Sequence, residues 1–181
     1  MHDGFRYSAE DHSYWLGERR LPSVTEVLKV LPNGYEHVSP EVLERKRVLG
    51  TAVHLACELD DRGTLDESTL DPAIQPYLSA WRRFRADTGF RCTVIEKSGY
   101  SRQYGYAGTL DRLGEIASAV SVVDLKCVAE LKPETGLQLA AYSQLVLEMG
   151  VIDRARRFTL PLPRVLYRVY RGGGRAVRSR A

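Results

Sequence analysis

The chain has 181 residues, of which 44% are hydrophobic and 27% charged, a composition typical of one globular domain and not of a disordered or fibrous protein. No run approaches the roughly 20 apolar residues that span a bilayer. The start MHDGFRYSAEDHSYW lacks the apolar segment of a secretory signal, so we expect a cytoplasmic location. The three cysteines form no CxxC pair and are too few for a four-cysteine iron–sulfur cluster, which leaves no sign of a zinc site or a disulfide framework.

The net charge of +3 is unevenly distributed along the chain. Residues 151–181 contain nine Arg and one acid, a net charge of +8, which leaves −5 for residues 1–150. A basic segment on an acidic body fits a nucleic-acid partner, because Arg neutralises phosphate and releases counterions. A solvated surface tail is the commoner meaning of such a run. We expect one domain over residues 1–160 and a basic, poorly ordered tail over 161–181.

The first sixty residues predict a hairpin followed by two helices. Within residues 5–21, apolar side chains alternate on both sides of the turn-forming SAED, as in a β-hairpin. Ser23 with Glu26 three residues later is a capping-box pattern, which predicts a short helix that stops before Pro32. Residues 39–61 have apolar side chains at helical spacing and predict a long helix.

The rest of the chain mixes helical and strand patterns. Residues 71–90 predict an amphipathic helix that ends at Gly89, and residues 134–150 predict another that ends at Gly150. Short β-branched and aromatic runs predict strands over 92–101, 104–114, 121–128, 156–162 and 165–170. This order of elements predicts an α/β or α+β fold, with a small mixed central β-sheet flanked by helices.

Charged residues interrupt two of the predicted strands. Side chains alternate between the two faces of a strand, so Asp124 and Lys126 project to one side and Leu125 to the other. Asp111 lies on the preceding strand, and the turn between the strands allows Asp111 to lie near the same face. One acid in a strand fits a solvated edge, whereas two acids and a lysine that converge fit that reading less well.

Two close carboxylates repel each other unless a cation lies between them. Mg²⁺ binds a few carboxylate oxygens and keeps several waters. Such an ion polarises a phosphodiester, and a nearby Lys offsets charge on the phosphoryl group. The strands therefore predict a divalent metal site suited to phosphodiester hydrolysis.

Two helical pairs accompany this site in the sequence. His54 has Glu58 one turn later, and Gln138 has Tyr142 at the same spacing on a later helix. A single His on a helix is more often a satisfied surface or core residue than a metal ligand. Glu58 is more simply a surface residue than a group that tunes the metal.

Taken together, these residues resemble the PD-(D/E)XK nuclease superfamily, in particular its RecB-like branch that includes phage exonucleases. The similarity spans residues 50–142 and rests on Gly50-x-x-x-His54, Asp111, Asp124-Leu125-Lys126 and Gln138-x-x-x-Tyr142. The segment LPSVTEVL is similar to the PSVT segment near the start of phage-encoded nucleases of this branch and of the mitochondrial genome maintenance exonuclease.

The resemblance implies a restriction-endonuclease-like core and assigns roles to individual residues. Mg²⁺ or Mn²⁺ would be bound by His54, Asp111, Asp124 and the Leu125 carbonyl, and Lys126 would be catalytic together with the two acids. Gln138 and Tyr142 would support the site or contact DNA. Ser23, Thr25 and nearby amides could hold a DNA phosphate at a helix N-terminus, although helix capping by Ser23 explains its position equally well.

The implied activity is that of a Mg²⁺- or Mn²⁺-dependent deoxyribonuclease, an exonuclease acting on DNA ends or single strands in phage or bacterial replication and recombination. A single-strand annealing or recombination protein is the expected protein partner. Two alternatives stay open: an inactive nuclease fold that only binds DNA, and a structure-selective endonuclease similar to a junction resolvase. The chain departs from the family pattern with Leu110 before the first Asp, with no four-cysteine cluster, and with an end that has no acid and no helical pattern.

Overall fold

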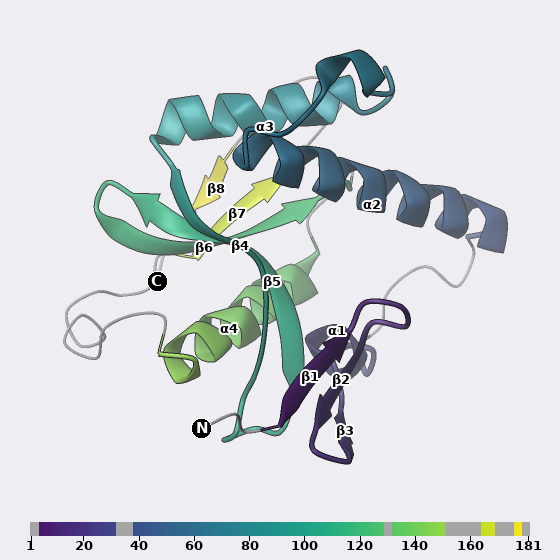
Figure 1. The fold of residues 1–181 in the computed structure, drawn as a ribbon, viewed down its shortest axis with the longest axis vertical. Coiled ribbons are helices and arrows are strands. Elements are labelled where there is room, and N and C mark those ends of the chain that lie inside the picture. The colour runs from purple at the N-terminus through teal and green to yellow at the C-terminus, as the bar shows by residue number, and fades with distance from the viewer. Residues whose placement is uncertain (1–3, 32–37, 129–131, 151–163, 169–175, 179–181) are drawn as a thin grey trace.

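The computed structural model describes residues 4–31, 38–128, 132–150, 164–168 and 176–178. They form an α+β fold with a three-stranded sheet, a five-stranded mixed sheet and helices on both sides of the larger sheet (Figure 1). The predicted fold class is therefore confirmed.

The N-terminal strands form a small antiparallel sheet of their own. The strands β1 (Phe5–Ser8), β2 (Ser13–Leu16) and β3 (Arg19–Leu21) follow one another in sheet order. The predicted hairpin is confirmed, and β3 extends it by a third strand. The short helix α1 (Val24–Leu28) follows with the predicted capping box, in which the Glu26 amide donates to the Ser23 hydroxyl and the Ser23 amide donates to the Glu26 carboxylate.

The central sheet has the order β4-β5-β6-β7-β8. Its first three strands are an antiparallel meander of β4 (Arg91–Tyr100), β5 (Ala107–Ile116) and β6 (Ala119–Lys126), close to the three predicted strands. The strand β7 (Arg164–Arg168) pairs in parallel with β6, and β8 (Ala176–Arg178) pairs antiparallel with β7. These two strands lie within residues 161–181, which we expected to be a poorly ordered tail. Their eight residues instead pair with the central sheet. The predicted strand over 156–162 lies outside the described residues.

Helices cover both faces of the central sheet. On one face lie α2 (Pro40–Asp61) and α3 (Gln75–Thr88), joined through the short 3₁₀ helix η1 (Glu67–Thr69), and α4 (Pro133–Glu148) lies on the other (Figure 1). The helix boundaries agree with the predicted ones, including the left-handed Gly89 that ends α3. Two apolar clusters hold the layers together, one between α2, α3 and the sheet, and one between α1, α4 and the sheet.

The two faces of β6 pack against different helices. Val123 and Leu125 belong to the cluster of α2 and α3, whereas Val122 belongs to the cluster of α4. Asp124 and Lys126 share the side of Val122 because side chains alternate along a strand. The packing is therefore consistent with the prediction that Asp124 and Lys126 lie on the same face of β6. The apolar layers on both sides of the sheet hold this strand in place.

Candidate metal centre

Asp124 and Lys126 form a buried ion pair at the end of β6. Lys126 Nζ lies 2.7 Å from Asp124 Oδ2, and Asp124 is 1% exposed. Among the described residues, Asp124 Oδ2 has no partner with ideal hydrogen-bond geometry, and a carboxylate oxygen beside a lysine still has a lone pair for another ligand. Burial raises the pKa of Asp124 despite the opposing charge of Lys126. Burial alone would lower the pKa of Lys126, but the charges of Asp124 and Asp111 outweigh it and raise that pKa.

Asp111 is fixed by the backbone of the neighbouring strand. The Leu125 amide donates to Asp111 Oδ2 at 2.6 Å, and the Asp111 side chain is almost buried. This bond ties β5 to the strand that carries Asp124. Because Leu125 stands between Asp124 and Lys126 in β6, this bond brings the Asp111 carboxylate beside the two charged residues of that strand.

His54 reaches the same place from α2. Its Nε2 lies 3.1 Å from the Leu125 carbonyl oxygen, which can only accept, so Nε2 carries the proton. The other ring nitrogen, Nδ1, faces Asp111 Oδ2 (3.7 Å) and Glu96 Oε1 (4.0 Å). A lone pair facing two carboxylates is favourable only when a proton or a cation lies between them. His54 is therefore oriented as a metal ligand would be.

Glu96 completes this group and was missed by the sequence analysis. It lies on β4, between the register pairs Ile95↔Arg112 and Lys97↔Leu110, and its backbone is left-handed with φ of 48°. A left-handed glutamate is uncommon. Burial and the charge of Asp111 raise the pKa of Glu96 to about 7. The signal that could have found it is the one that singled out Asp111: a carboxylate inside a β-branched strand.

The buried Arg112 forms an ion pair with Glu96 and fixes the position of its carboxylate. This arginine is completely buried, donates from Nη1 to Glu96 Oε1 at 2.9 Å and from Nε to Asp61 Oδ2 at 2.6 Å. Asp61 ends α2 and also accepts from the Trp81 indole of α3 at 2.9 Å. The network therefore links both covering helices to the strand that carries Glu96, and it keeps a buried charge paired.

The residues His54, Glu96 and Asp111 offer one ligand atom each within 4.8 Å of one another. One imidazole nitrogen and carboxylate oxygens are a donor set that suits Mn²⁺ or Mg²⁺. Asp124 lies outside this group of three and forms an ion pair with Lys126. Its Oδ2 could still bind a metal ion, since no hydrogen bond to it is found among the described residues. The predicted Leu125 carbonyl accepts from His54, so it orients a ligand in this structure.

The two residues on α4 lie beside the site. Gln138 Nε2 donates to the Tyr142 hydroxyl at 3.0 Å, and Tyr142 is buried. Burial raises the pKa of Tyr142, and the charges of Asp124 and Asp111 add to the effect, which places its hydroxyl near both acids. Gly108 of β5 permits this packing, because a Cβ there would lie 2.9 Å from the Tyr142 ring. The pair supports the wall of the site.

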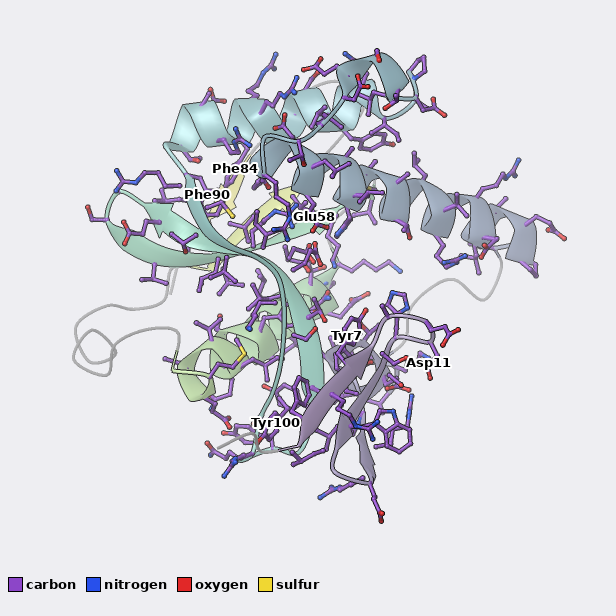
Figure 2. All side chains as sticks on the ribbon, viewed as in Figure 1. Tyr7, Asp11, Glu58, Phe84, Phe90 and Tyr100 are labelled. Carbon is purple, nitrogen blue, oxygen red and sulfur yellow. The ribbon has the colours of Figure 1, made fainter. Side chains whose placement is uncertain are left out.

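The remaining predicted residues are not brought into this group. Ser23 caps α1, and Thr25 is exposed on the same short helix. Glu58 lies on α2 (Figure 2), where its Oε1 accepts from Arg62 Nε at 3.0 Å. Its structural role is an ion pair along the helix, which agrees with the simpler of the two sequence readings.

Comparisons with known proteins add no family assignment. No protein-family model matches the chain, and no curated protein matches it. None of the helices in the described ranges is long and apolar enough to cross a membrane.

Proposed function

We propose that this protein is a metal-dependent DNA nuclease that hydrolyses phosphodiester bonds, with DNA ends or single strands as its substrate. The observation that carries the proposal is the convergence of His54, Glu96 and Asp111 on one point beside the Asp124–Lys126 pair. Arg112 pairs with Glu96 and Lys126 pairs with Asp124, whereas the group that faces Asp111 is the His54 imidazole. His54 Nδ1 faces Asp111 Oδ2 at 3.7 Å and Glu96 Oε1 at 4.0 Å, and a divalent cation between these three groups would stabilise the arrangement.

The residues of the site divide the chemical work. His54, Glu96 and Asp111 would hold a divalent cation, with Asp124 Oδ2 available as a further ligand. The bound cation supplies Lewis-acid stabilisation of charge on the phosphoryl group. Lys126, kept protonated by Asp124 and Asp111, places an ammonium group where it offsets the same charge. Gln138 and Tyr142 fix the opposite wall.

Cleavage of end-labelled single-stranded and duplex DNA tests this proposal. We expect cleavage with Mg²⁺ or Mn²⁺ and none with EDTA. Asp111→Asn and Lys126→Ala should each reduce the rate at least about 100-fold, because each removes a group that acts on the transition-state charge. Both variants should still bind DNA, measured by fluorescence anisotropy in EDTA.

Glu58→Gln is the matched control, since Glu58 lies one turn from His54 and pairs with Arg62. It should retain the wild-type rate. If the protein binds DNA but does not cleave it with either metal, the nuclease proposal is wrong. The result would then support an inactive nuclease fold that only binds DNA. Closed circular single-stranded DNA separates the two modes of cleavage, because an exonuclease cannot begin on it and an endonuclease can.

A further inference from the structure

The outer face of the N-terminal sheet carries a row of one aromatic and two basic side chains. In the register of the three strands, Arg6 of β1 lies opposite Trp15 of β2, and Trp15 lies opposite Arg20 of β3. Side chains at directly opposed positions share a face and are about 5 Å apart at Cβ. Arg6 and Arg20 are exposed, and Trp15 is partly exposed. The row therefore runs across the whole sheet as Arg–Trp–Arg.

The inner face of this sheet already accounts for its packing. Tyr14 and Leu21 are buried there, and the rings of Phe5 and Tyr7 stack on Tyr14 with centroids 6.4 and 5.0 Å away. Phe5 also stacks on Tyr100 of β4 at 5.1 Å. These contacts attach the small sheet to the central one. The outward row takes no part in these contacts, which leaves the partly exposed Trp15 and the two arginines available to a ligand.

The indole of Trp15 is held in a fixed orientation. Its Nε1 donates to the Ser13 hydroxyl at 2.9 Å, and that hydroxyl donates to Asp11 at 2.8 Å. Ser13 is buried and Asp11 is exposed, so the bond to the indole lies at the buried end of this chain. The only polar group of the indole is thus satisfied inside the protein, and the apolar ring surface remains for contact with a flat apolar partner.

The two arginines are also preorganised. Arg20 Nη2 pairs with Glu26 Oε1 at 2.7 Å, and Arg6 Nη2 donates to the Gly17 carbonyl at 3.2 Å. A guanidinium has five N–H donors, so each arginine keeps donors for a phosphate. Arg6 donates to a backbone carbonyl and not to an acid, so its positive charge is available to a phosphate, whereas the charge of Arg20 is shared with Glu26.

We propose that the Arg6–Trp15–Arg20 row binds single-stranded DNA, with a base stacked on Trp15 and phosphates on the two arginines. A single strand offers both groups at once. An acidic peptide offers only the charge, and a duplex keeps its base faces stacked and inaccessible. The inference rests on the proposed nuclease function for the identity of the ligand, and it narrows the proposed substrate from DNA ends or single strands to single strands.

The strand β1, which carries Arg6, points toward α2, the helix that carries His54 (Figure 2). Figure 2 shows Tyr7 and Asp11 near the end of the β1–β2 hairpin that faces α2, and Tyr100 near the opposite end of β1. Tyr7 lies on the inner face of the small sheet, where its ring stacks on Tyr14. Arg6 is the neighbouring residue on the other face. The row therefore begins on a strand whose hairpin end faces α2, the helix that carries His54 (Figure 2).

Binding of an oligothymidine of about 15 nucleotides to the full chain in EDTA tests the proposal. The protein has two tryptophans, and Trp81 is fully buried, so quenching of tryptophan fluorescence reports Trp15. We expect quenching by the single strand and much weaker binding of a duplex of equal length. Trp15→Ala should weaken binding roughly 5- to 100-fold, and Arg6→Ala and Arg20→Ala should each lower the salt slope by about 0.7.

Two further variants keep the test decisive. Trp15→Phe retains a ring, so it should abolish the quenching but keep affinity within about threefold of wild type. Arg91→Ala, an equally exposed arginine paired with Glu115 at the far end of β4, should keep wild-type affinity and salt slope. Two results together would overturn the proposal: the single strand does not quench the fluorescence of the wild-type protein, and the Trp15→Ala, Arg6→Ala and Arg20→Ala variants bind it with wild-type affinity. Because no metal is present, a loss of binding here is distinguishable from a failure of the proposed catalysis.

Discussion

At the scale of single residues, Glu96 has the most informative environment. Its carboxylate lies close to Asp111 and His54 on one side and is paired with the buried Arg112 on the other. In the sequence it stands next to Lys97 in a strand of mixed polarity, which a solvated edge explains equally well. Only the left-handed backbone and the contact to Arg112 turn this carboxylate toward the site.

The raised pKa of Glu96 predicts how stability depends on pH. Folded Glu96 keeps its proton up to about pH 7, whereas the unfolded chain loses it near 4.5, so the folded state binds more protons between these values. The stability of the metal-free protein should therefore fall as pH rises from 4.5 to 7. Glu96→Gln should remove about 1–3 kcal/mol of that fall, measured by urea unfolding in EDTA at both ends of the window.

Asp124 acts in the same direction, so part of the fall should persist in the variant. The exposed Glu10 provides the control, since Glu10→Gln should keep the wild-type pH dependence. A Glu96→Gln protein with an undiminished fall would mean that Arg112 keeps this carboxylate charged in the folded state.

Lys126 and Asp124 show why residue identity alone is not enough. In the sequence they are two charges on one side of a strand, and in the structure they neutralise each other at 2.7 Å. Within the described part of the chain, Asp124 Oδ2 has no hydrogen bond, and it lies on the strand beside Asp111, one of the three candidate ligands. A cation at the site would compete with Lys126 for Asp124, which couples the charge of the lysine to metal binding.

At the scale of elements, β5 depends on a glycine for its contact with α4. A Cβ at Gly108 would lie 2.9 Å from the Tyr142 ring and 3.1 Å from Val24, both of which belong to the apolar cluster of α4. Gly108→Ala should destabilise the fold by about 1–3 kcal/mol through overpacking. It should also reduce nuclease activity, because Tyr142 must shift next to Asp111 and Asp124. Thermal unfolding and the cleavage assay measure the two effects.

Gly50 of α2 provides a control of opposite sign. A Cβ there meets nothing within 4 Å, and alanine favours a helix over glycine by roughly 0.5–1 kcal/mol. Gly50→Ala should therefore raise the unfolding temperature. If Gly108→Ala were as stable as Gly50→Ala, then α4 would be free to move away from the sheet, and the wall formed by Tyr142 would not be rigid.

At the scale of the whole molecule, the candidate metal centre joins the layers of the fold. His54 belongs to α2, whereas Glu96 and Asp111 belong to two strands of the sheet. A cation bound only by the folded chain adds free energy of RT ln(1 + [L]/Kd), about 2.7 kcal/mol at 100 times Kd. We expect Mn²⁺ or Mg²⁺ to raise the unfolding temperature at pH 8, measured by scanning calorimetry.

The same ions should leave the unfolding temperature of Asp111→Asn nearly unchanged, since one of the three converging ligands has lost its charge. Glu58→Gln should respond as the wild type does, because its carboxylate belongs to an ion pair with Arg62. An equal rise in Asp111→Asn and in the wild type would show that the ions act elsewhere on the protein.

The sequence by itself determined the elements, because their signals are local. The capping box at Ser23 and the left-handed Gly89 set the helix ends, and alternation set the strands. It also singled out the charged residues of β5 and β6, since carboxylates in apolar strands are costly without a partner.

Only the tertiary structure decided which of these residues meet. Leu125 and His54 are 71 positions apart in the chain, and their contact depends on how α2 lies across the sheet. The role of Glu96 depends on its backbone angle and on a buried arginine, neither of which leaves a local pattern. The outward position of Trp15 became certain only with the register of the three strands, because a shift of one residue would have moved it to the inner face.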